Sequence, residues 1–597
     1  TANPLVYCGS VGIGPHQAHV RRAQPGDHIL VIGGRRGRDG LRGATFSSLT
    51  MDAQTGQVAG ASVQIGDPIT EKGVIEVSIR ARDARLYHAI TDCGAGGLSS
   101  AVGEMSEAIG ARVDLSAVPL KYAGLSPWEI WLSEAQERMV LAAPVSNIAA
   151  IQALCDTYDV EMSDIGEFSG DGRLQVLYHD IPVVDLEEEF LHHGIPQMTL
   201  EMGAPRSQSV DVGSEIKDVK FAAVHGEQQC QANNHLLLAL LAHPNIASKE
   251  EIIRRYDHEV RGATIVRPFA GVAQVGPSDA AVLKPLETPG WRGFVLANGI
   301  NPFLGEADPY WMAFSVVDEA VRNAVAVGAD PKRLALLDNF CWGDPRRPET
   351  MSSLVAAAQG CRDASLYYQA PFISGKDSLN NEYLGSDGQR HAIPGTLLIS
   401  SIAIHPDVRC AVTMDLKTPG NRLYLAGDFQ PSLAGSHAVL VAGAGAFDDS
   451  PALHRAPGQP QHANHVYQAL HAAIHSGLVC SAHDLSEGGL AVAGAEMALA
   501  GRLGLRLDTN ALGANARLAL FGETNGCLLV EVRPEDCKAF EEHFERPFGD
   551  SACEICRPVG EVVAEEVIQV IYNREIVLEL DVDSLIKAFT MPGPASK

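Results

Sequence analysis

A long internal repeat limits the possible folds of this chain more than any other feature. The stretch TDCGAGGLSSAVGEMSEA at residues 91–108 recurs as HDLSEGGLAVAGAEMALA at residues 483–500, with eight of the eighteen aligned positions identical. The shared positions include Asp92 and Asp484, a glycine pair, and the apolar pattern of a helix. An acid, two glycines and a helix pattern are rarely kept together by chance. The chain therefore carries two copies of one unit.

Flanking segments repeat in the same order. PGDHILVIGG at 25–34 matches PGNRLYLAGD at 419–428, and SEAQERMVL at 133–141 matches GETNGCLLV at 522–530. The offsets from first to second copy are 394, 392 and 389 residues (419 minus 25, 483 minus 91, 522 minus 133). A period this long, with small insertions, indicates a duplicated domain and not a solenoid of short repeats.

The alignment also predicts how the chain is divided. Residues 3–13 align with 394–404, and the second copy begins near Gly262, so about 130 residues of the second copy have no counterpart here. We expect that counterpart upstream of Thr1. At 597 residues the chain is too long for one core. We call the front half of each copy its N-type domain and the rear half its C-type domain. The first copy is expected to comprise the end of an N-type domain at 1–17 and a C-type domain at 18–184. A connector with a short helix at 185–261 precedes the second N-type domain at 262–408 and the second C-type domain at 409–597.

The expected fold class is α/β or α+β. Apolar residues at helical spacing predict a helix in YWMAFSVVDEAVRNAVAVG (310–328), and GTLLISSIAI (395–404) is typical of a strand.

Composition excludes several classes of protein. A formal net charge of -27 argues against a nucleic-acid partner, because phosphate backbones need basic surface. No stretch approaches the ~20 apolar residues of a membrane span, and no signal peptide is evident, so we expect a cytoplasmic protein. The 12 cysteines are scattered, as expected of reduced thiols. Cys553 and Cys556 have metal-ligand spacing, but two further ligands are missing, so we interpret the spacing as accidental.

The repeated segment itself has two interpretations. A glycine loop before a helix offers backbone N–H groups to a phosphate, and Asp92 at its entrance is a hard ligand suited to Mg²⁺. Alternatively, it is a structural glycine turn with a capping aspartate.

A second group of polar residues lies in the front half of the second copy. In ISGKDSLNNE, Gly375, Lys376 and Ser378 provide close backbone, one cation and one hydroxyl, although the spacing is not that of a Walker A loop. A polar turn between strands is the alternative.

The motifs VQIGDPITEK, DCGAGGL, LSEAQER, DNFCWGDP and SGKDSLNNE, in this order, closely resemble phosphoribosylformylglycinamidine synthase along nearly the entire chain. The resemblance implies an internally duplicated aminoimidazole ribonucleotide synthetase-like fold, in which two copies form a pseudo-dimer and the first copy is incomplete here.

The resemblance also implies roles for matching residues. The implied substrate contacts are Gln64, Glu134, Ala135, Gln136 and Ser378, with Ala135 where the family usually has serine. The implied ATP contacts are Asp338, Gly375 and Lys376, and the implied magnesium ligand is Asp92. Because Lys376 stands where many relatives have a metal-binding Asn, and a lysine cannot ligate Mg²⁺, a phosphate contact is expected there. Glu319, Asn323, Asp484 and Ser486 match an auxiliary nucleotide site of larger members. No catalytic residue is expected in this chain, because the family's catalytic histidine lies upstream of Thr1.

The implied reaction is ATP-dependent amidation of formylglycinamide ribonucleotide, with ATP and Mg²⁺ as cofactors. ATP activates the amide oxygen, and ammonia displaces phosphate to give the amidine. No glutaminase nucleophile elbow is evident, so we expect ammonia from a glutaminase subunit or domain, with a small bridging subunit as a further partner.

Two alternatives stay open. Another enzyme of the superfamily, such as a selenophosphate or thiamine-phosphate kinase relative, would share the glycine loops and acids without needing the linked second copy. A non-catalytic nucleotide-binding scaffold is the other alternative.

Overall fold

The structure is a computed structural model of the chain. It describes residues 5–16, 22–44, 50, 52, 54–55, 64–203, 226–256, 258–447 and 450–591. The chain forms two compact units. Unit 1 comprises Thr1–Thr199 and Asn380–His391, and unit 2 comprises Leu200–Leu379 and Ala392–Lys597.

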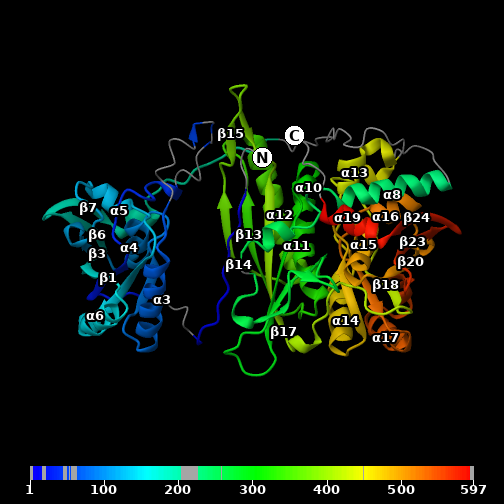
Figure 1. The fold of residues 1–597 in the computed structure, drawn as a ribbon. Helices are drawn as coiled ribbons and strands as arrows, with labels where there is room; N and C mark the ends of the chain where they lie inside the picture. The colour runs from blue at the N-terminus through cyan, green and yellow to red at the C-terminus, as the bar shows by residue number, and fades with distance from the viewer. Residues whose placement is uncertain are drawn as a thin grey trace. The chain divides into compact units, whose positions relative to one another are not determined.

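A seven-stranded sheet with the order β2-β4-β1-β5-β3-β6-β7 is the centre of unit 1 (Figure 1). Neighbouring strands are antiparallel except β3 and β6, which are parallel. The strands are β1 (Asp27–Gly33), β2 (Ala89–Asp92), β3 (Ala111–Asp114), β4 (Arg138–Pro144), β5 (Met162–Glu167), β6 (Arg173–Tyr178) and β7 (Ile181–Glu187). The helices are α3 (Pro68–Asp83), α4 (Leu98–Ser106), α5 (Pro127–Leu132), α6 (Ile148–Thr157) and α7 (Glu188–His193).

Alternation along β1 explains why helices cover both faces of this sheet. Ile29 and Val31 point to one face and pack in a core with residues of α4 and α5. Leu30 and Ile32 point to the other face and pack with residues of α3 and α6. Since side chains of a strand alternate between faces, an uninterrupted apolar run such as this predicts a strand buried on both sides.

The second C-type domain repeats this topology. Its sheet has the order β19-β21-β18-β22-β20-β23-β24, which corresponds strand for strand to the sheet of unit 1, and β20 and β23 are again the parallel pair. The strands are β18 (Arg422–Ala426), β19 (Val479–Asp484), β20 (Gly504–Asp508), β21 (Leu528–Val532), β22 (Cys556–Val563), β23 (Val567–Tyr572) and β24 (Glu575–Asp581). The helices are α13 (His437–Ala442), α14 (Ala463–His475), α15 (Gly489–Gly501), α16 (Ala516–Phe521), α17 (Cys537–Phe548), α18 (Ala552–Ile555) and α19 (Val582–Thr590). The predicted duplication is confirmed at the level of topology.

The predicted second N-type region contains a six-stranded sheet of order β14-β13-β17-β12-β11-β8. The strands are β8 (Thr264–Val266), β11 (Ala281–Leu283), β12 (Gly293–Ile300), β13 (Leu334–Cys341), β14 (Phe372–Ser378) and β17 (Thr396–His405). Two small ribbons pair β9 (Phe269–Ala270) with β10 (Gly276–Pro277) and β15 (Glu382–Leu384) with β16 (Arg390–Ala392). The helices are α10 (Pro302–Ala307), α11 (Pro309–Ala326) and α12 (Pro348–Tyr368), the last two lying beside the sheet in Figure 1.

Both local predictions in this region are confirmed, since α11 covers the predicted helix and β17 covers the predicted strand. One apolar core joins the six-stranded sheet and α11 to the face of the C-type sheet that carries α14 and α17. A second core lies between the opposite face of that sheet and the helices α8, α15, α16 and α19.

The expected connector holds more structure than one short helix. Besides α7 it contains α8 (Glu227–Leu241) and α9 (Glu250–Ile253). Asn233 and Asn234 of α8 donate hydrogen bonds of 2.8 Å to the carbonyls of Val577 and Glu579 on β24. Leu236 and Leu240 are fully buried in the core of unit 2. This helix is therefore an integral part of unit 2.

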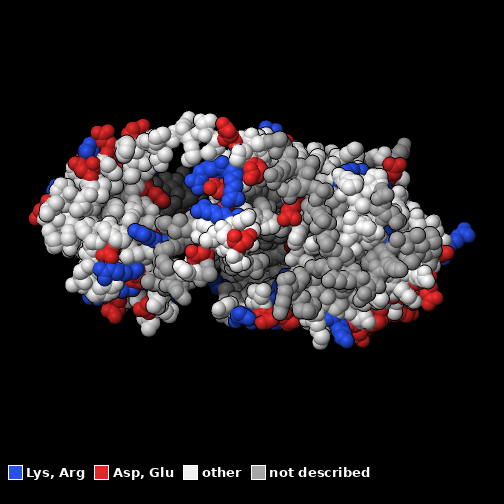
Figure 2. Space-filling model, turned by 90° about the horizontal axis from the view of Figure 1, so that it is seen from above, with Lys and Arg blue, Asp and Glu red and all other residues white. Residues whose placement is uncertain are grey.

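The surface agrees with the composition. On the face shown in Figure 2, basic side chains occur in small groups among acidic and neutral ones. Within the described residues, every helix is too short or too polar to cross a lipid bilayer.

Candidate functional site

The glycine loop precedes a helix in both copies, as predicted. The loops lead into α4 and α15, whose N-cap glycines Gly97 and Gly488 have φ angles of 60° and 79°. In the first copy, the N–H of Gly96 donates to Oε1 of Glu134 over 3.2 Å. In the second, the N–H of Gly488 donates to Oε1 of Glu523 over 3.0 Å. At both N–H groups, a buried carboxylate of the protein thus occupies the position expected for a bound phosphate. This favours the interpretation of the loop as a structural glycine turn over that of a phosphate-binding loop at these two N–H groups.

The three predicted polar substrate contacts of unit 1 lie together. Gln136 donates to the side-chain oxygen of Gln64, and Gln64 donates to Glu134 over 3.4 Å. Glu134 is 5% exposed and also accepts the N–H of Ala44 at 3.1 Å. Ala135 is buried. The carboxylate of Glu134 therefore holds the surrounding backbone and the Gln64 amide, whereas the two glutamines are the accessible members of the group.

A cavity of about 800 Å³ adjoins this group, and Gln136 lines it together with the N-terminus of α3 at Gly66–Asp67 and with Lys121. Glu137 also lines the cavity and has a left-handed backbone with φ 54°. Burial raises the pKa of the Glu137 carboxyl. A non-glycine residue in this strained region at a cavity wall is typical of a binding site.

Asp92, the predicted magnesium ligand, lies at the end of β2 and is exposed in unit 1. Its Oδ1 accepts the N–H of Gly94 over 2.8 Å, an Asx-type turn that leaves Oδ2 available.

The predicted ATP contacts of unit 2 lie on two adjacent parallel strands. Asp338 on β13 pairs with Gly375 on β14, and Cys341 pairs with Ser378, which was predicted as a substrate contact and lies on the same strand as Gly375. A Cβ atom at residue 375 would lie 2.3 Å from Oδ1 of Asp338, so only glycine leaves room for this carboxylate. Burial raises the pKa of Asp338. Lys376 is exposed, and its ammonium donates to the carbonyl of Asp377.

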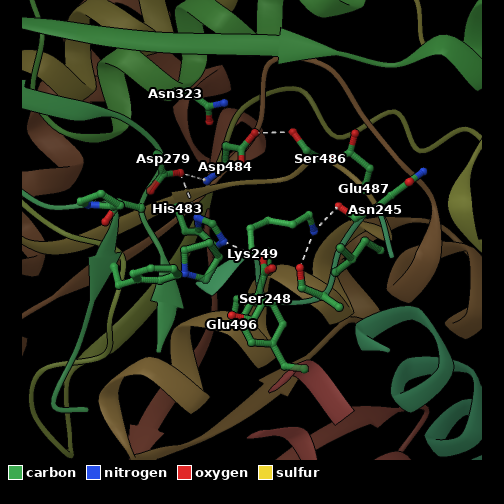
Figure 3. A pocket seen from close by; sticks show the side chains of 18 of the residues that line it. Asn245, Ser248, Lys249, Asp279, Asn323, His483, Asp484, Ser486, Glu487 and Glu496 are labelled. Carbon is green, nitrogen blue, oxygen red and sulfur yellow. Dashed lines mark hydrogen bonds and ion pairs between the residues drawn. The ribbon is translucent and has the colours of Figure 1, made fainter. Parts of the chain in front are cut away.

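The four residues predicted for the auxiliary site converge on one pocket of about 410 Å³ in unit 2 (Figure 3). They come from α11, from the end of β19 and from the loop that follows β19. The structure adds residues that sequence reasoning missed. These are Asn245, Ser248 and Lys249 after α8, Asp279 before β11, His483 on β19, and Glu487 and Glu496 near α15.

Two oxygens in this pocket have no hydrogen-bond partner within the described part of the chain, namely Oδ2 of Asp279 and Oδ1 of Asn323. The Asp279 side chain is 1% exposed, and its Oδ1 accepts the N–H of Asp484 at 3.0 Å. Burial raises the pKa of Glu319 well above its ordinary value, and Glu487 and Asp484 raise it further. Buried acceptors without donors and crowded carboxylates fit a bound cation, because a cation satisfies the oxygens and removes their mutual repulsion.

His483 belongs to the acidic group but does not suit the role of a ligand. Ligand atoms of Asp279, His483 and Asp484 lie within 4.8 Å of one another. Both ring nitrogens of His483 are already engaged, Nδ1 with Asp279 and Nε2 with Glu496, each at 2.9 Å. Burial lowers the pKa of His483, but the two carboxylates raise it overall well above its usual range, so the ring is an imidazolium. The remaining candidate ligand atoms of this group are all oxygens, and oxygen ligands favour Mg²⁺ over Zn²⁺.

Arg322 holds one wall of the pocket in place. Its guanidinium is 2% exposed and donates to Oδ2 of Asp484 at 3.1 Å and to the Ser486 hydroxyl at 2.9 Å. On its other side it bonds Asp318, which is fully buried and accepts the hydroxyls of Tyr368 and Tyr467. The buried ion-pair network around Arg322 therefore orients two of the predicted site residues, Asp484 and Ser486. The local sequence does not reveal this network.

Among the described residues, the group of side chains that could hold a metal ion does not include Cys553 or Cys556. Cys553 is exposed and Cys556 is buried at the start of β22.

Comparison with known proteins identifies relatives of the whole arrangement. The family model described as AIR synthase related protein, C-terminal domain, matches residues 24–179 and 418–573, and the N-terminal domain model matches 277–390. Phosphoribosylformylglycinamidine synthase subunit PurL of Deinococcus radiodurans is 35% identical over 548 residues, covering 90% of this chain and 69% of that protein. Thermotoga maritima PurL complexed with ATP aligns with a TM-score of 0.59 at 20% identity, covering 91% of this chain and 71% of that chain. The same protein complexed with FGAR gives a TM-score of 0.60 at 23% identity, covering 91% and 72%. These structures support the fold.

Proposed function

Because the chain belongs to the PurL family of phosphoribosylformylglycinamidine synthase subunits, we propose that it serves ATP-dependent conversion of formylglycinamide ribonucleotide to formylglycinamidine ribonucleotide in purine biosynthesis. The observation that carries the proposal is 35% identity over 90% of the chain, together with two copies of the same sheet. A selenophosphate or thiamine-phosphate kinase relative would need no second copy.

The substrate end of the reaction is assigned to unit 1. Gln136 lines the cavity and bonds Gln64, so its amide is fixed and available to a polar ligand, and Gln64 lies directly beside it. Glu134 acts behind them by holding Gly96 and Ala44. In this proposal the glutamines contact the substrate, and Glu134 positions them.

The nucleotide end is assigned to β13 and β14 of unit 2. Asp338 and the open backbone at Gly375 form one surface, and Lys376 reaches solvent beside them. Phosphoryl transfer depends chiefly on positioning and charge neutralisation. In unit 2, Lys376 would supply a mobile positive charge to the phosphates. Asp92 of unit 1 is proposed separately as a ligand of Mg²⁺, an ion that would supply Lewis-acid neutralisation of phosphate charge when bound.

The partners follow from the family. Relatives are named as a subunit of the synthase. We propose a glutaminase subunit or domain as the source of ammonia, a small bridging subunit between the two, and a cytoplasmic location.

Calorimetric titration of the chain with formylglycinamide ribonucleotide tests the substrate assignment. Gln64→Ala and Gln136→Ala should each weaken binding about tenfold, the loss of roughly 1.4 kcal/mol expected for a hydrogen-bonding partner. Gln197→Ala, at an exposed glutamine of unit 1 outside the cavity lining, is the matched control and should bind like the parent. Failure of the parent chain to bind this nucleotide would contradict the proposal.

A second proposed function is a metal-linked nucleotide site in the pocket of unit 2. The specific observation is the pair of unpartnered oxygens on Asp279 and Asn323 beside Glu319 and Asp484. An acidic pocket would repel a bare nucleotide, so phosphates would bind there through divalent cations, with Ser486 and Lys249 as further contacts.

Manganese binding measured by electron paramagnetic resonance, with and without ADP, tests this site. Asp279→Asn and Asp484→Asn should each lower manganese affinity at least tenfold, because a hard cation prefers carboxylates. Asp508→Asn changes an exposed carboxylate at the end of β20 and should have no effect. Equal manganese affinity in the parent and all three variants would show that the pocket has a purely structural role.

A further inference from the structure

Two buried arginines lie beneath the substrate-binding run of unit 1. Arg36 is 1% exposed and Arg138 is 4% exposed. Nη1 of Arg36 donates to the carbonyls of Ile130 and Ser133 at 2.6 and 3.0 Å. Arg138 donates to the carbonyl of Ser133 at 3.0 Å and, through Nε, to that of Ala135 at 2.8 Å. Each of these hydrogen bonds from the two guanidinium groups therefore ends on a neutral carbonyl.

Several donors of this pair are left over. Nε and Nη2 of Arg36 and Nη1 of Arg138 are buried and have no hydrogen-bond partner among the described residues. Burial and the neighbouring Arg138 both lower the pKa of Arg36. Since a guanidinium stays protonated in proteins, two like charges lie close together in the interior.

Arg322 of unit 2 shows how this chain otherwise buries an arginine. It is equally buried, but two carboxylates, Asp318 and Asp484, flank it. They raise its pKa even though burial alone would lower it. Among the described residues, neither Arg36 nor Arg138 has a carboxylate within ion-pair distance, and the acids that act on Arg138 without pairing with it are Asp39 and Glu137. A buried charge without a partner costs several kcal/mol, so a counter-charge is required.

The only acidic group found against Arg36 is the Cys93 thiol, which is 3% exposed. Its burial opposes ionisation, so a neutral thiol would leave Arg36 without a counter-charge, whereas Asp39 and Glu137 act electrostatically on Arg138. The thiol is also a weak acceptor for the leftover donors.

We propose that Arg36 and Arg138 form a binding site for a small monovalent anion of the halide class, chloride in the cell, held beneath Ser133–Ala135. Such an ion would accept hydrogen bonds from the unpartnered N–H groups of both side chains. Its single negative charge would offset the repulsion between the two guanidinium groups. Both arginines are almost fully buried, and a monatomic ion needs less space beside them than phosphate or a carboxylate ligand. The ion would fix the backbone run that ends at Gln136. The site stands independently of the proposed function.

Bromide is the direct probe of this site. Crystals of the chain soaked in sodium bromide should give an anomalous peak within about 3.5 Å of the leftover nitrogens of both arginines, a distance typical of a weak charge-assisted hydrogen bond. The experiment uses the unmodified chain, so it remains decisive even where a variant fails to fold.

Hydrogen exchange provides the test in solution. Amides of residues 126–138 should exchange at least tenfold more slowly in chloride than in gluconate at equal ionic strength. Arg36→Met should abolish this difference, whereas Arg82→Met, at an exposed arginine of α3, should keep it. No bromide peak at the arginines, together with equal exchange in both salts, would overturn the proposal and leave ionised Cys93 as the counter-charge. A chloride effect that persists in Arg36→Met would also overturn it.

Discussion

Three histidines surround the turn that follows α11, and they make the stability of unit 2 depend on pH. Nε2 of His405 lies 3.1 Å from the carbonyl of Val327. His471 and His475 of α14 both contact the carbonyl of Gly328, at 3.1 and 3.0 Å. The ring of His475 lies 5.0 Å from that of His405 and 4.5 Å from that of His471. His405 is fully buried, and its Nδ1 has no hydrogen-bond partner among the described residues.

The sign of the effect follows from the pKa of His405. This pKa is lowered from 6.5 to about 4 in total. Burial is the largest cause, His475 and His471 act in the same direction, and the bond to Val327 and the charge of Asp407 oppose the decrease. The folded state therefore holds the ring neutral, while the unfolded chain protonates it near pH 6.5. The stabilisation is complete above about pH 6.5 and is lost as pH falls towards 4. A difference of 6.5 minus 4 corresponds to at most about 3 kcal/mol, of which about 2 kcal/mol disappears between pH 7 and 5.

Other groups titrate in the same window, so a difference measurement is needed. Burial raises the pKa of Glu487 to about 7, which makes the folded state more stable as pH falls from 7 to about 4.5 and opposes the histidine. His471 also has a lowered pKa, caused first by burial and then by His475, and adds to the loss at low pH. Comparison with His405→Gln cancels these contributions, since glutamine keeps an N–H donor for the carbonyl but does not titrate.

Urea unfolding at pH 7, 6 and 5 measures the effect. The parent should lose about 2 kcal/mol more than His405→Gln between pH 7 and 5. His235→Gln, at an exposed histidine of α8, should follow the parent. Parallel curves for the parent and His405→Gln, within about 0.5 kcal/mol, would refute the argument that His405 is held neutral.

Further substitutions test other features of the structure. Arg322→Met leaves two buried carboxylates unpaired and should cost about 3 to 5 kcal/mol in urea unfolding, whereas Arg422→Met breaks an exposed pair and should cost under about 1. Gly33→Ala places a Cβ 1.9 Å from a backbone oxygen at φ 109° and should cost more than about 2 kcal/mol, whereas Gly172→Ala, with open space around it, should cost about 1, and equal thermal shifts would contradict this. Lys376→Ala should leave unfolding unchanged and raise the half-saturating ATP concentration of the complete enzyme at least tenfold, roughly 1.4 kcal/mol, and overlapping ATP titrations would make Lys376 a surface residue only.

The sequence predicted the parts of the fold that depend on local pattern. The repeated strand before each glycine loop, the helix after it, and the helix and strand at α11 and β17 follow from apolar periodicity and glycine positions. The predicted ATP contacts Asp338 and Gly375 lie opposite each other because β13 and β14 are adjacent parallel strands, a pairing that apolar periodicity does not predict.

Residues that reach the site from distant segments could not be predicted. Asp279 has no equivalent in the first copy as given, so the repeat could not mark it. Lys249 lies in the predicted connector. The helix α8 of that segment packs on β24, more than three hundred positions away, and so distant a partner leaves no local pattern in the sequence. Arg36 follows a glycine pair at the end of a strand, and nothing local indicates that its side chain turns inward beneath Ser133.

The two copies show why an identical motif does not guarantee an identical site. Gly96 and Gly488 each donate to a buried glutamate, so the loop itself is built in the same way twice. The aspartates before the loops differ, because Asp92 is exposed in unit 1 while Asp484 is 7% exposed and bonded to Arg322. Arg322 comes from α11, a helix of the N-type region. In unit 2 the motif determines the position of the acid, and α11, the helix packed against it, buries that acid and pairs it with Arg322.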